Sequence, residues 1–467
     1  MSHQLEVSIP GFRGRVIGPD DAEYETARKV WNGAIDHRPA VIAQCVTAED
    51  VAAALAYAKS AELDVSVRGG AHNFAGNAVW PGSLTIDLSP MARVEVDPAN
   101  RIVRCEGGAL LSGLDAATQE HGLAVPSGTI SHTGVGGLTL GGGFGWLTRD
   151  LGLSIDNIES VRMVLADGRI VEASEQSHPD LFWAIRGGGG NFGVVTDFTF
   201  RAHPVGPLVN LGMVFWSVDQ GAEPLRVIRE TLAKLPPGNG ALIGSAMNAP
   251  PAPFVPEQHH FAPGHALIIV GFGGAEEHTA LIERVKAALP PLFAFATPVP
   301  FTALQQMLDE AAPPGILAYE RALYLDDLTD DAIAVIADYA TRKSSPMSFA
   351  PIFRLDGAFT EVDDDATAFG GERRPCYVLN TACVAPTPEL LGADTAWVRA
   401  FWDALVPHAR NAGSYVNFMV EKDQERILAA YGPEKYRRLA AIKADYDPEN
   451  VFNHNANIKP AVAASAA

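Results

Sequence analysis

The stretch "VRGGAHNFAG", residues 67–76, places one histidine, His72, behind an arginine and two glycines. The segment 47–68 is typical of a helix with Thr47 as its N-cap, followed by a short strand that ends at Arg68. A strand is therefore expected to lead into a loop in which glycine lets a ligand come close to the backbone. A histidine in a loop is commonly just solvated, so the role of His72 depends on what the rest of the chain supplies.

A second glycine-rich stretch, "GVGGLTLGGGFG", occupies residues 134–145 and holds seven glycines in twelve positions. Backbone N–H groups at this density can form a concave site for anionic phosphates, and tight bends that only pack strands are the alternative. The two glycine-rich loops lie more than sixty residues apart. Together they predict one extended dinucleotide that lies across both.

A literal G-x-G-x-x-G pattern occurs at Gly188, Gly190 and Gly193. The dinucleotide fingerprint needs a strand before these glycines and a helix after them, so that the pyrophosphate meets a helix N-terminus. Here a helix is expected before the pattern and a strand after it. The pattern therefore does not predict a nicotinamide-dehydrogenase site.

Composition excludes several classes of partner. The chain of 467 residues has 35 basic and 55 acidic side chains, a net charge of −20, and no basic stripe that could bind nucleic acid or anionic lipid. It begins without a signal-peptide pattern and has no apolar run of the roughly 18 residues that a membrane span needs. We expect a cytoplasmic protein that binds neither nucleic acid nor membrane.

The four cysteines lie far apart and form no CxxC pair. Each lies in or beside an apolar, strand-like segment, which predicts buried free thiols rather than disulfides or a zinc site. No metal site is expected. The four are Cys45, Cys105, Cys376 and Cys383.

The pattern of secondary structure changes near residue 206. Short strands and helices without regular βαβ alternation precede this point, and longer strands and helices follow it. We therefore predict an α+β chain of two domains. Residues 1–206 together with 412–467 form the first, and residues 207–411 form a substrate domain built on an antiparallel sheet.

Four stretches carry a family resemblance: "VRGGAHNFAG", "SGTISHTGVGGLTLGGGFGWL", "DLFWAIRGGGGNFGVVTDF" and "YDPENVFNHNANIKP". They resemble the flavin-linked oxidases of the berberine bridge enzyme type, whose FAD-binding fold is shared with vanillyl-alcohol oxidase. The resemblance covers essentially the whole chain and implies FAD across both loops, roofed by the antiparallel sheet. It assigns cofactor contacts to Arg68, Gly69, Gly70, Ala71, His72, Asn73, Gly128, Thr129, Thr133, Gly134, Gly137, Gly142, Val195, Tyr415, Asn417 and Asn455.

The same resemblance implies that His72 is a covalent tether. In the family the first loop is usually R-G-G-G-H, and the histidine is bonded to the 8α-methyl of the isoalloxazine. Here Ala71 replaces the third glycine, which costs little if its φ is negative. Many relatives carry a second tether, a cysteine four residues before the glycine that matches Gly134, but this chain has Ile130 there. A singly linked flavin is therefore expected.

The choice of a catalytic base is open. Tyr415 and Asn417 match a Y-x-N strand beside the flavin, and the tyrosine that acts as base in related sugar oxidases is replaced by Phe418. The resemblance places a base at Glu361. Strand alternation favours Asp356 instead, because Glu361 would fall on the opposite, apolar face. Solvated charges at a strand end are the alternative for both carboxylates.

Further candidates come from the strand-like segment "AYERALYLDDL", which offers Glu320, Arg321 and Tyr324 as pocket residues. Thr133 is expected close to the N5 edge of the flavin, where its hydroxyl could bond N5, shape an oxygen pocket or simply bond backbone.

The predicted reaction is hydride transfer from a small organic substrate to flavin N5, followed by reoxidation by oxygen with release of H2O2. The substrate is an amine or an alcohol, and the charge of −20 favours cationic or neutral molecules. A sugar oxidase and a non-catalytic flavin-binding protein are the alternatives. The oligomeric state is open.

Overall fold

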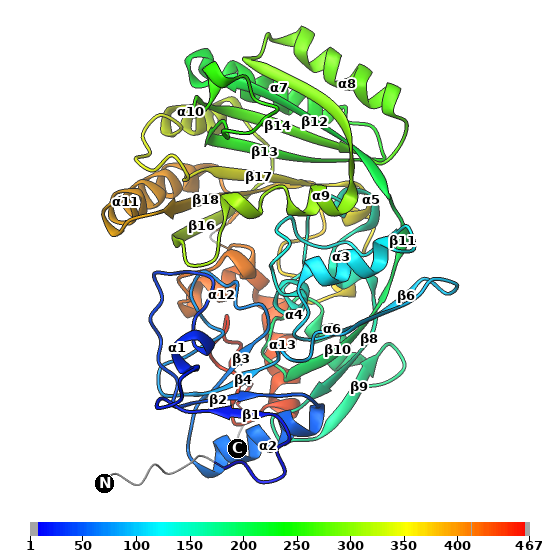
Figure 1. The fold of residues 1–467 in the computed structure, drawn as a ribbon, viewed down its shortest axis with the longest axis vertical. Helices are drawn as coiled ribbons and strands as arrows, with labels where there is room; N and C mark the ends of the chain where they lie inside the picture. The colour runs from blue at the N-terminus through cyan, green and yellow to red at the C-terminus, as the bar shows by residue number, and fades with distance from the viewer. Residues whose placement is uncertain (1–7, 412, 463–467) are drawn as a thin grey trace.

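The computed structural model describes residues 8–411 and 413–462. Helices and sheets are mixed along the chain, and the largest sheet is antiparallel, so the predicted α+β fold is confirmed. Figure 1 shows this sheet in the upper half of the molecule and the N-terminal elements in the lower half. The predicted domain boundaries at residues 206 and 411 stay a prediction.

The loop with His72 follows an edge strand of a small, mainly parallel sheet. Its strand order is β1 (Arg15–Ile17), β2 (Val41–Gln44), β4 (Leu84–Asp87) and β3 (Val65–Arg68). The predicted helix is α2 (Ala48–Ser60), with a capping box between Thr47 and Asp50. The predicted strand is β3, which ends at Arg68.

A five-stranded antiparallel sheet follows along the chain. Its order is β5 (Val94–Asp97), β6 (Ile102–Glu106), β10 (Val194–Arg201), β8 (Ile158–Val164) and β9 (Ile170–Ser174). The hairpin between β8 and β9 turns at Gly168, whose φ is +86°. The helices of this region are α1 (Tyr24–Ala27), α3 (Leu111–Gln119), α4 (Val135–Leu140), α5 (Thr148–Leu151) and α6 (Pro179–Ile185). The short strands β7 (Leu123–Ala124) and β11 (His203–Pro204) pair with each other.

The seven-stranded sheet is antiparallel throughout. Its order is β15 (Phe293–Pro300), β12 (Leu208–Ser217), β14 (Pro263–Gly271), β13 (Asn239–Asn248), β17 (Ala350–Leu355), β18 (Cys376–Ala385) and β16 (Leu317–Leu325).

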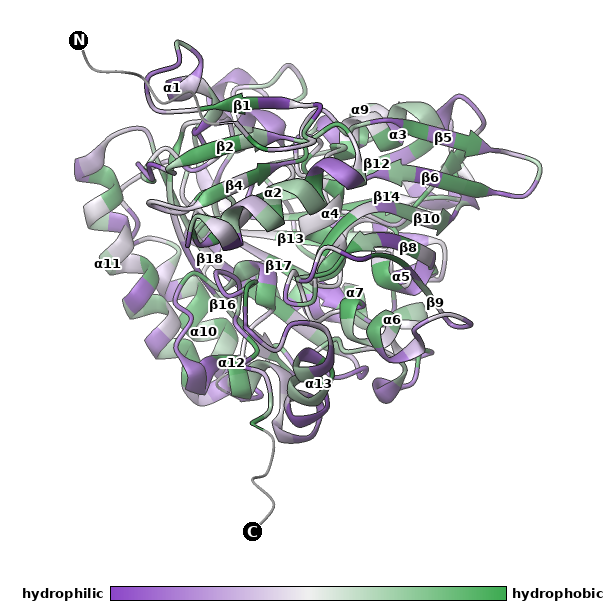
Figure 2. Cartoon of the chain, turned by 90° about the horizontal axis from the view of Figure 1, so that it is seen from below, coloured by the Kyte–Doolittle hydropathy of each residue, from purple (hydrophilic) through white to green (hydrophobic). Residues whose placement is uncertain are grey.

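Long helices cover one face of this sheet (Figure 1): α7 (Glu223–Ala233), α8 (Ala275–Ala288), α10 (Asp330–Tyr339) and α11 (Pro388–Leu405). In Figure 2, α11 shows bands of purple and green, as expected for a helix that buries one side. Trp397, Val398 and Phe401 are on the buried side. The opposite face of the sheet points toward the lower half of the molecule. The short helix α9 (Phe301–Gln306) lies at its edge.

The C-terminal segment returns to the lower half of the molecule, where α12 (Gln424–Tyr431) and α13 (Pro433–Tyr446) lie (Figure 1). Two local predictions were wrong. The Y-x-N segment is a 3-10 turn over Val416–Phe418 rather than a strand. The strand expected to run through residue 359 ends at Leu355 and gives way to a 3-10 turn over Gly357–Thr360.

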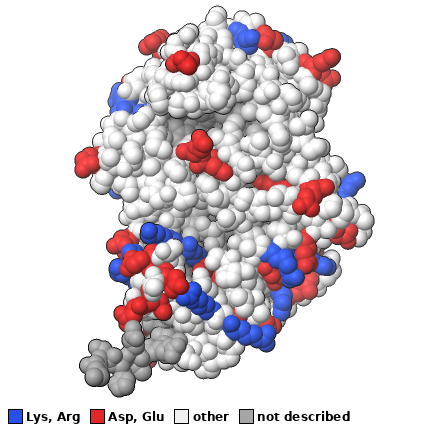
Figure 3. All heavy atoms as spheres, in the orientation of Figure 1, with Lys and Arg blue, Asp and Glu red and all other residues white. Residues whose placement is uncertain are grey.

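The four cysteines are buried free thiols, as predicted. Within residues 8–411 and 413–462, no helix is both long and apolar enough to cross a membrane. The same residues contain no cluster of three or more His, Cys, Asp or Glu side chains that could hold a metal ion. Figure 3 shows charged side chains gathered over the lower half of one face, and a hollow in the upper half that is bordered mainly by uncharged atoms.

Candidate active site

A cavity of about 830 Å³ lies between the glycine-rich loops and the open face of the seven-stranded sheet. This volume is near the upper end of the range of about 300–1,000 Å³ that is usual for small-molecule sites. We call the loop side the floor, formed by lining residues within 65–78, 128–144 and 188–195. We call the sheet side the roof, formed by lining residues of β12, β13, β14, β16, β17 and β18.

Much of the floor is glycine main chain, and its two glycine-rich loops touch each other. A Cβ atom added to Gly70 would lie 2.3 Å from the backbone nitrogen of Gly134, and one added to Gly134 would lie 2.3 Å from the nitrogen of Gly70. A side chain at either position would push the loops apart. At Gly137, by contrast, nothing lies within 4 Å of an added Cβ, and this residue borders the cavity. The floor thus offers main-chain groups to a ligand.

His72 lines the cavity at one end of the floor. Its ring stacks on Trp31 with centroids 4.6 Å apart, and its Nε2 lies 3.1 Å from Nδ1 of His132. Burial, together with the neighbouring His132, lowers the pKa of His72 to about 3. The imidazole is therefore neutral at physiological pH and can act as a nucleophile.

Ala71 departs from the expectation of a negative φ, because its φ is +52°. A left-handed conformation costs a residue with a Cβ atom about 1–2 kcal/mol relative to the right-handed one, which is why glycine is favoured there. The methyl group of Ala71 is buried in a small apolar cluster with Val30, Ala78 and Val79. Burial of this methyl group offsets part of the backbone strain.

The roof is largely apolar, because alternate residues of its strands point toward the floor. The other face of the same strands packs under the helices. The roof residues are Met213, Leu242, Gly244, Ile268, Glu320, Pro351, Phe353, Asn380, Ala382 and Val384, with Met247 and Asn248 at the end of β13.

One polar pair interrupts this roof. Nδ2 of Asn380 donates a hydrogen bond of 2.6 Å to Oε2 of Glu320. The two residues are diagonal neighbours on β16 and β18, since Glu320 lies opposite Ala382. Burial raises the pKa of Glu320 to about 8, so this carboxyl group is protonated at neutral pH. Its Oε1 is buried with no hydrogen-bond partner in the described part of the chain.

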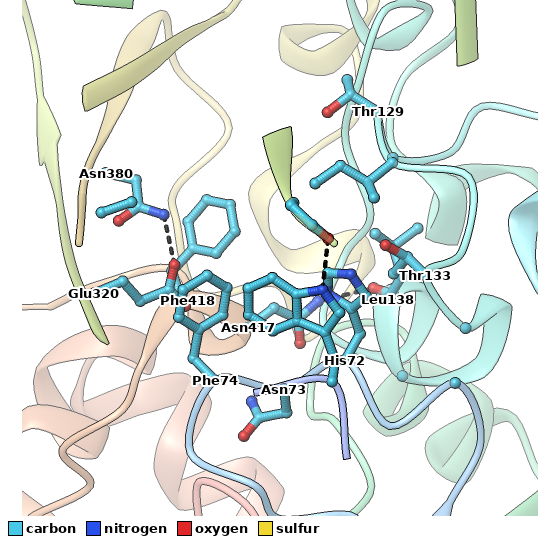
Figure 4. A pocket seen from close by; sticks show the side chains of 18 of the residues that line it. His72, Asn73, Phe74, Thr129, Thr133, Leu138, Glu320, Asn380, Asn417 and Phe418 are labelled. Carbon is cyan, nitrogen blue, oxygen red and sulfur yellow. Dashed lines mark hydrogen bonds between the residues drawn. The ribbon is translucent and has the colours of Figure 1, made fainter. Parts of the chain in front are cut away.

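Figure 4 shows how these groups are arranged around the cavity. Glu320 and Asn380 lie at one side, and Thr133 and Leu138 lie at the other. Phe418 lies next to the polar pair. The pair is fully enclosed by protein, since Glu320 is 0% exposed and Asn380 is 4% exposed.

Lys422 is the single Lys or Arg among the described residues that line the cavity. Its Nζ makes one long hydrogen bond, 3.3 Å, to the carbonyl oxygen of His454. Burial lowers the pKa of Lys422 to about 7. An anionic group in the cavity would restore the charge of this side chain.

Most of the predicted cofactor residues border the cavity. The exceptions are Arg68 and Gly142. The guanidinium of Arg68 donates to the carbonyl oxygen of Ala27 and is not among the groups that line the cavity. Gly142 lies behind the floor against Phe369. Whether the other predicted residues contact FAD stays a prediction.

The Y-x-N motif fixes the shape of the floor. Oη of Tyr415 accepts a hydrogen bond of 2.9 Å from the backbone N–H of Gly143. Nδ2 of Asn417 donates to the carbonyl oxygen of Leu138 at 2.9 Å and to Oη of Tyr415 at 2.9 Å. These bonds hold the second glycine-rich loop, at Leu138 and Gly143, to the C-terminal segment.

Two of the predicted bases do not reach the cavity, which corrects the assignment of both. Glu361 is exposed and caps the 3-10 turn that follows β17, because the chain leaves the sheet after Leu355. Asp356 accepts hydrogen bonds of 2.7 Å from Nε of Arg149 and of 2.7 Å from Nε of Arg354, so its charge is already paired.

Of the remaining candidates, Thr133 and Glu320 line the cavity. Tyr324 does not, because it is buried in the hydrophobic core that also contains Phe369 and Tyr415. Arg321 points to the other face of β16, where it pairs with Glu421 and lies over Trp402. The sequence patterns did not predict four residues of the site: Asn380, Lys422, His132 and Trp31. Period-2 alternation on two expected strands could have grouped Glu320 with Asn380, but the register between the strands is not visible in a sequence.

Comparisons with known proteins agree with this geometry. Residues 39–174 match the family model described as FAD binding domain, and residues 414–459 match the one described as berberine and berberine like. An FAD-linked oxidoreductase of Dictyostelium discoideum is 31% identical over 96% of this chain and 95% of its own length. (R)-6-hydroxynicotine oxidase of Paenarthrobacter nicotinovorans is 30% identical over 98% of this chain and 99% of its own length.

The crystal structure of 6-hydroxy-D-nicotine oxidase from Arthrobacter nicotinovorans is similar along the whole chain. Its TM-score is 0.85 at 26% identity, and the match covers 98% of this chain and 100% of that one. Fold and site together define an FAD-dependent oxidoreductase with the vanillyl-alcohol oxidase type of fold. The chain belongs to the berberine bridge enzyme-like family of these enzymes.

Proposed function

We propose that this enzyme is an oxidase of small, largely apolar amines, with FAD attached covalently through His72 and molecular oxygen as electron acceptor. The observation that carries the proposal is a neutral His72 on a backbone floor, facing an apolar roof across one cavity. FAD, when bound, accepts a hydride at N5 and passes two electrons to oxygen, which leaves as H2O2.

The residues present fit FAD. Gly69, Gly70, Gly134 and Gly137 leave backbone groups open along the floor, where a dinucleotide can lie close to the main chain. Lys422 is the one Lys or Arg of the described lining, and its amino group, when protonated, suits the diphosphate of FAD. Ile130 occupies the position of the second tether, so the proposed linkage is single.

A sugar fits the roof poorly. Each hydroxyl of a bound sugar needs a hydrogen-bond partner, and a buried polar group without one costs about 1–3 kcal/mol. The roof offers few such partners, because it consists mainly of Met, Leu, Ile, Phe, Val and Ala side chains. A compact molecule with one polar group suits this surface better.

An amine is favoured over an alcohol because an alcohol must lose its O–H proton as the hydride leaves. Phe418 has no proton to exchange, and Glu320 is protonated at neutral pH. In an amine the nitrogen lone pair assists the loss of hydride, so no strong base is required. The relative named (R)-6-hydroxynicotine oxidase, similar over 98% of this chain, supports the same substrate class.

An alcohol substrate is the second candidate, with Glu320 as proton acceptor. The observation in its favour is that Oε1 of Glu320 has no partner in the described part of the chain. The two candidates differ in the effect expected of Glu320→Gln on flavin reduction. Loss of a general base lowers this rate by about 10²–10⁴-fold, whereas oxidation of an amine without a base changes it by a few-fold.

The experiment has two parts. The purified protein is precipitated with acid and run on a denaturing gel, where wild type should stay fluorescent and His72→Ala should not. Wild-type protein that releases its flavin would contradict the covalent link. A panel of cyclic amines and of alcohols of the same carbon skeleton is then mixed anaerobically with the holoenzyme. Bleaching by the alcohols alone, with recovery in air, would overturn the amine assignment, and bleaching by neither series would overturn the proposed substrate range.

A further inference from the structure

The ring of His72 is held between two aromatic neighbours. Trp31 stacks on it with an interplanar angle of 20°, and His132 lies beside it with ring centroids 5.0 Å apart. Nε2 of His72 and Nδ1 of His132 are 3.1 Å apart. Because this contact occupies Nε2, Nδ1 is the nitrogen of His72 that is left for a ligand in the cavity.

His132 is itself rigidly placed. The residue before it, Ser131, is bonded through its backbone N–H and its hydroxyl to Asp309, at 2.8 Å and 2.6 Å. The residue after it, Thr133, accepts a backbone hydrogen bond of 2.9 Å from Leu111. His132 does not line the cavity, although Ile130 and Thr133 do, so its ring stands behind His72. The contact between the two imidazoles is therefore part of the fold.

A hydrogen bond between two neutral imidazoles holds one proton, on one nitrogen or the other. When the proton is on Nε2 of His72, the lone pair of His72 is on Nδ1 and is available for bonding. When it is on Nδ1 of His132, Nδ1 of His72 carries its own proton and is not nucleophilic. Nε2 of His132 is buried with no partner in the described ranges, so no carboxylate or carbonyl group locks His132 in one tautomer.

We propose that His132 is a positioning residue for flavin attachment, which selects the reactive tautomer of His72 and accepts its Nε2 proton. This inference rests on the proposed covalent link through His72. It assigns to His132 a role in building the holoenzyme, separate from the oxidation of substrate.

Covalent attachment joins His72 to FAD with loss of one hydrogen from each. A bond forms between Nδ1 of His72 and the 8α carbon of FAD, and one C–H bond of that carbon breaks. The C–H proton leaves, the electron pair of that bond stays on the isoalloxazine, and Nε2 of His72 gives its proton to Nδ1 of His132. Molecular oxygen takes the two electrons and two protons and leaves as H2O2. His132 thus takes the positive charge that would otherwise stay on the alkylated ring of His72, and it becomes neutral again when its proton passes to the reduced oxygen as the second of the two protons of H2O2.

The test measures covalent attachment directly. Full-length protein is produced in riboflavin-starved cells, purified without flavin and mixed with FAD in air. Samples are quenched in denaturant at intervals, and the fluorescence of the protein band on a denaturing gel gives the rate of attachment. Reversible binding of FAD is measured separately on the same variants, by the change in flavin fluorescence at the start of the reaction.

His132→Leu removes the acceptor and is expected to slow attachment by about 100-fold or more, with FAD still bound reversibly. His132→Asn keeps an oxygen near the place of Nδ1, which can hold the tautomer but is not basic, so a rate about tenfold below wild type is expected. His121→Asn, at an exposed histidine, is the control and should attach flavin at the wild-type rate.

The outcomes separate the two proposals. If wild type binds FAD but never forms a fluorescent band, the covalent link fails and the role of His132 fails with it. If wild type attaches FAD and His132→Leu attaches it at a similar rate, only the role of His132 is overturned. Should His132→Leu not fold, His132→Asn decides, because attachment at the wild-type rate in that variant would equally overturn the role.

Discussion

The floor and the roof of the cavity are built in opposite ways. The floor is rich in glycine main chain, and its two glycine-rich loops approach so closely that a Cβ atom at Gly70 would lie 2.3 Å from the backbone nitrogen of Gly134. The roof is side chains, drawn from strands between residues 208 and 385. A backbone floor can accept the same cofactor whatever the substrate, whereas a side-chain roof can change by single substitutions. The difference suggests that the floor fixes the cofactor and that the roof selects the substrate.

The largest effect is expected when the floor is given a side chain. Gly134→Val should destabilise the fold by about 3 kcal/mol or more, because the added atoms overlap the backbone of Gly70 and cannot be repacked. Little flavin should remain bound. Gly137→Ala is the matched control, since it adds a methyl group where nothing lies within 4 Å. Urea denaturation and flavin content of the two variants check this, and equal stabilities would show that the floor is less rigid than described.

The next largest effect is expected on the pH dependence of stability, through Glu320 of the roof. The pKa of Glu320 is raised from 4.5 to about 8, so the native state holds this proton more tightly than the unfolded chain. The contribution of Glu320 to stability is therefore complete below about pH 4.5 and is lost as the pH rises toward about 8. Glutamine does not ionise, so the stability of Glu320→Gln should not fall in this way as the pH rises. Relative to wild type, the variant should gain about 2 kcal/mol or more between pH 5 and pH 8.5.

The measurement for Glu320 is urea denaturation at both pH values. Glu361→Gln is the control, because Glu361 is exposed and lies outside the cavity. A difference between wild type and Glu320→Gln that stays constant with pH would mean that Glu320 titrates normally. The roof would then contain an ordinary carboxylate, and the alcohol candidate would gain support.

A smaller effect is expected at Lys422, the one Lys or Arg side chain of the lining within the described part of the chain. Lys422→Met keeps the length of the side chain and removes its charge, so reversible binding of FAD should weaken about tenfold through loss of one charge-assisted contact. The dissociation constant is measured in a His72→Ala background, where no covalent link hides it. Lys59→Met is the control, because Lys59 is exposed and pairs with Glu449. Unchanged affinity in Lys422→Met would place the diphosphate away from Lys422.

The smallest effect concerns Ala71. Ala71→Gly relieves a left-handed alanine, worth about 1 kcal/mol, and removes a buried methyl group worth about 0.8 kcal/mol. The two changes oppose each other, so the free energy of unfolding should change by less than about 1 kcal/mol. Thermal denaturation checks this. A loss of several kcal/mol would show that the methyl group, and not the backbone, sets the position of His72.

The floor could be predicted from the sequence because its residues are consecutive. His72 stands four residues after the end of β3, and the glycines of the second loop occur within twelve positions, so their number and spacing alone indicate a backbone site. Glycine carries this information locally, since it marks the places where main chain approaches main chain or ligand. The capping box of α2, the Gly168 turn and the free thiols were equally local and equally predictable.

The tertiary structure decided the rest. Glu361 and Asp356 were favoured on resemblance and alternation, yet β17 ends at Leu355, six residues before Glu361, and two arginines pair with Asp356. Glu320 meets Asn380, and His72 meets His132, across 60 residues of chain in each case. Such pairs depend on strand register and on loop contact, which follow from the packing of the whole chain rather than from any local pattern. Thus the sequence by itself determined the family, the cofactor floor and the residue that we propose as the tether, whereas packing alone decided which polar groups line the cavity and which stand behind His72.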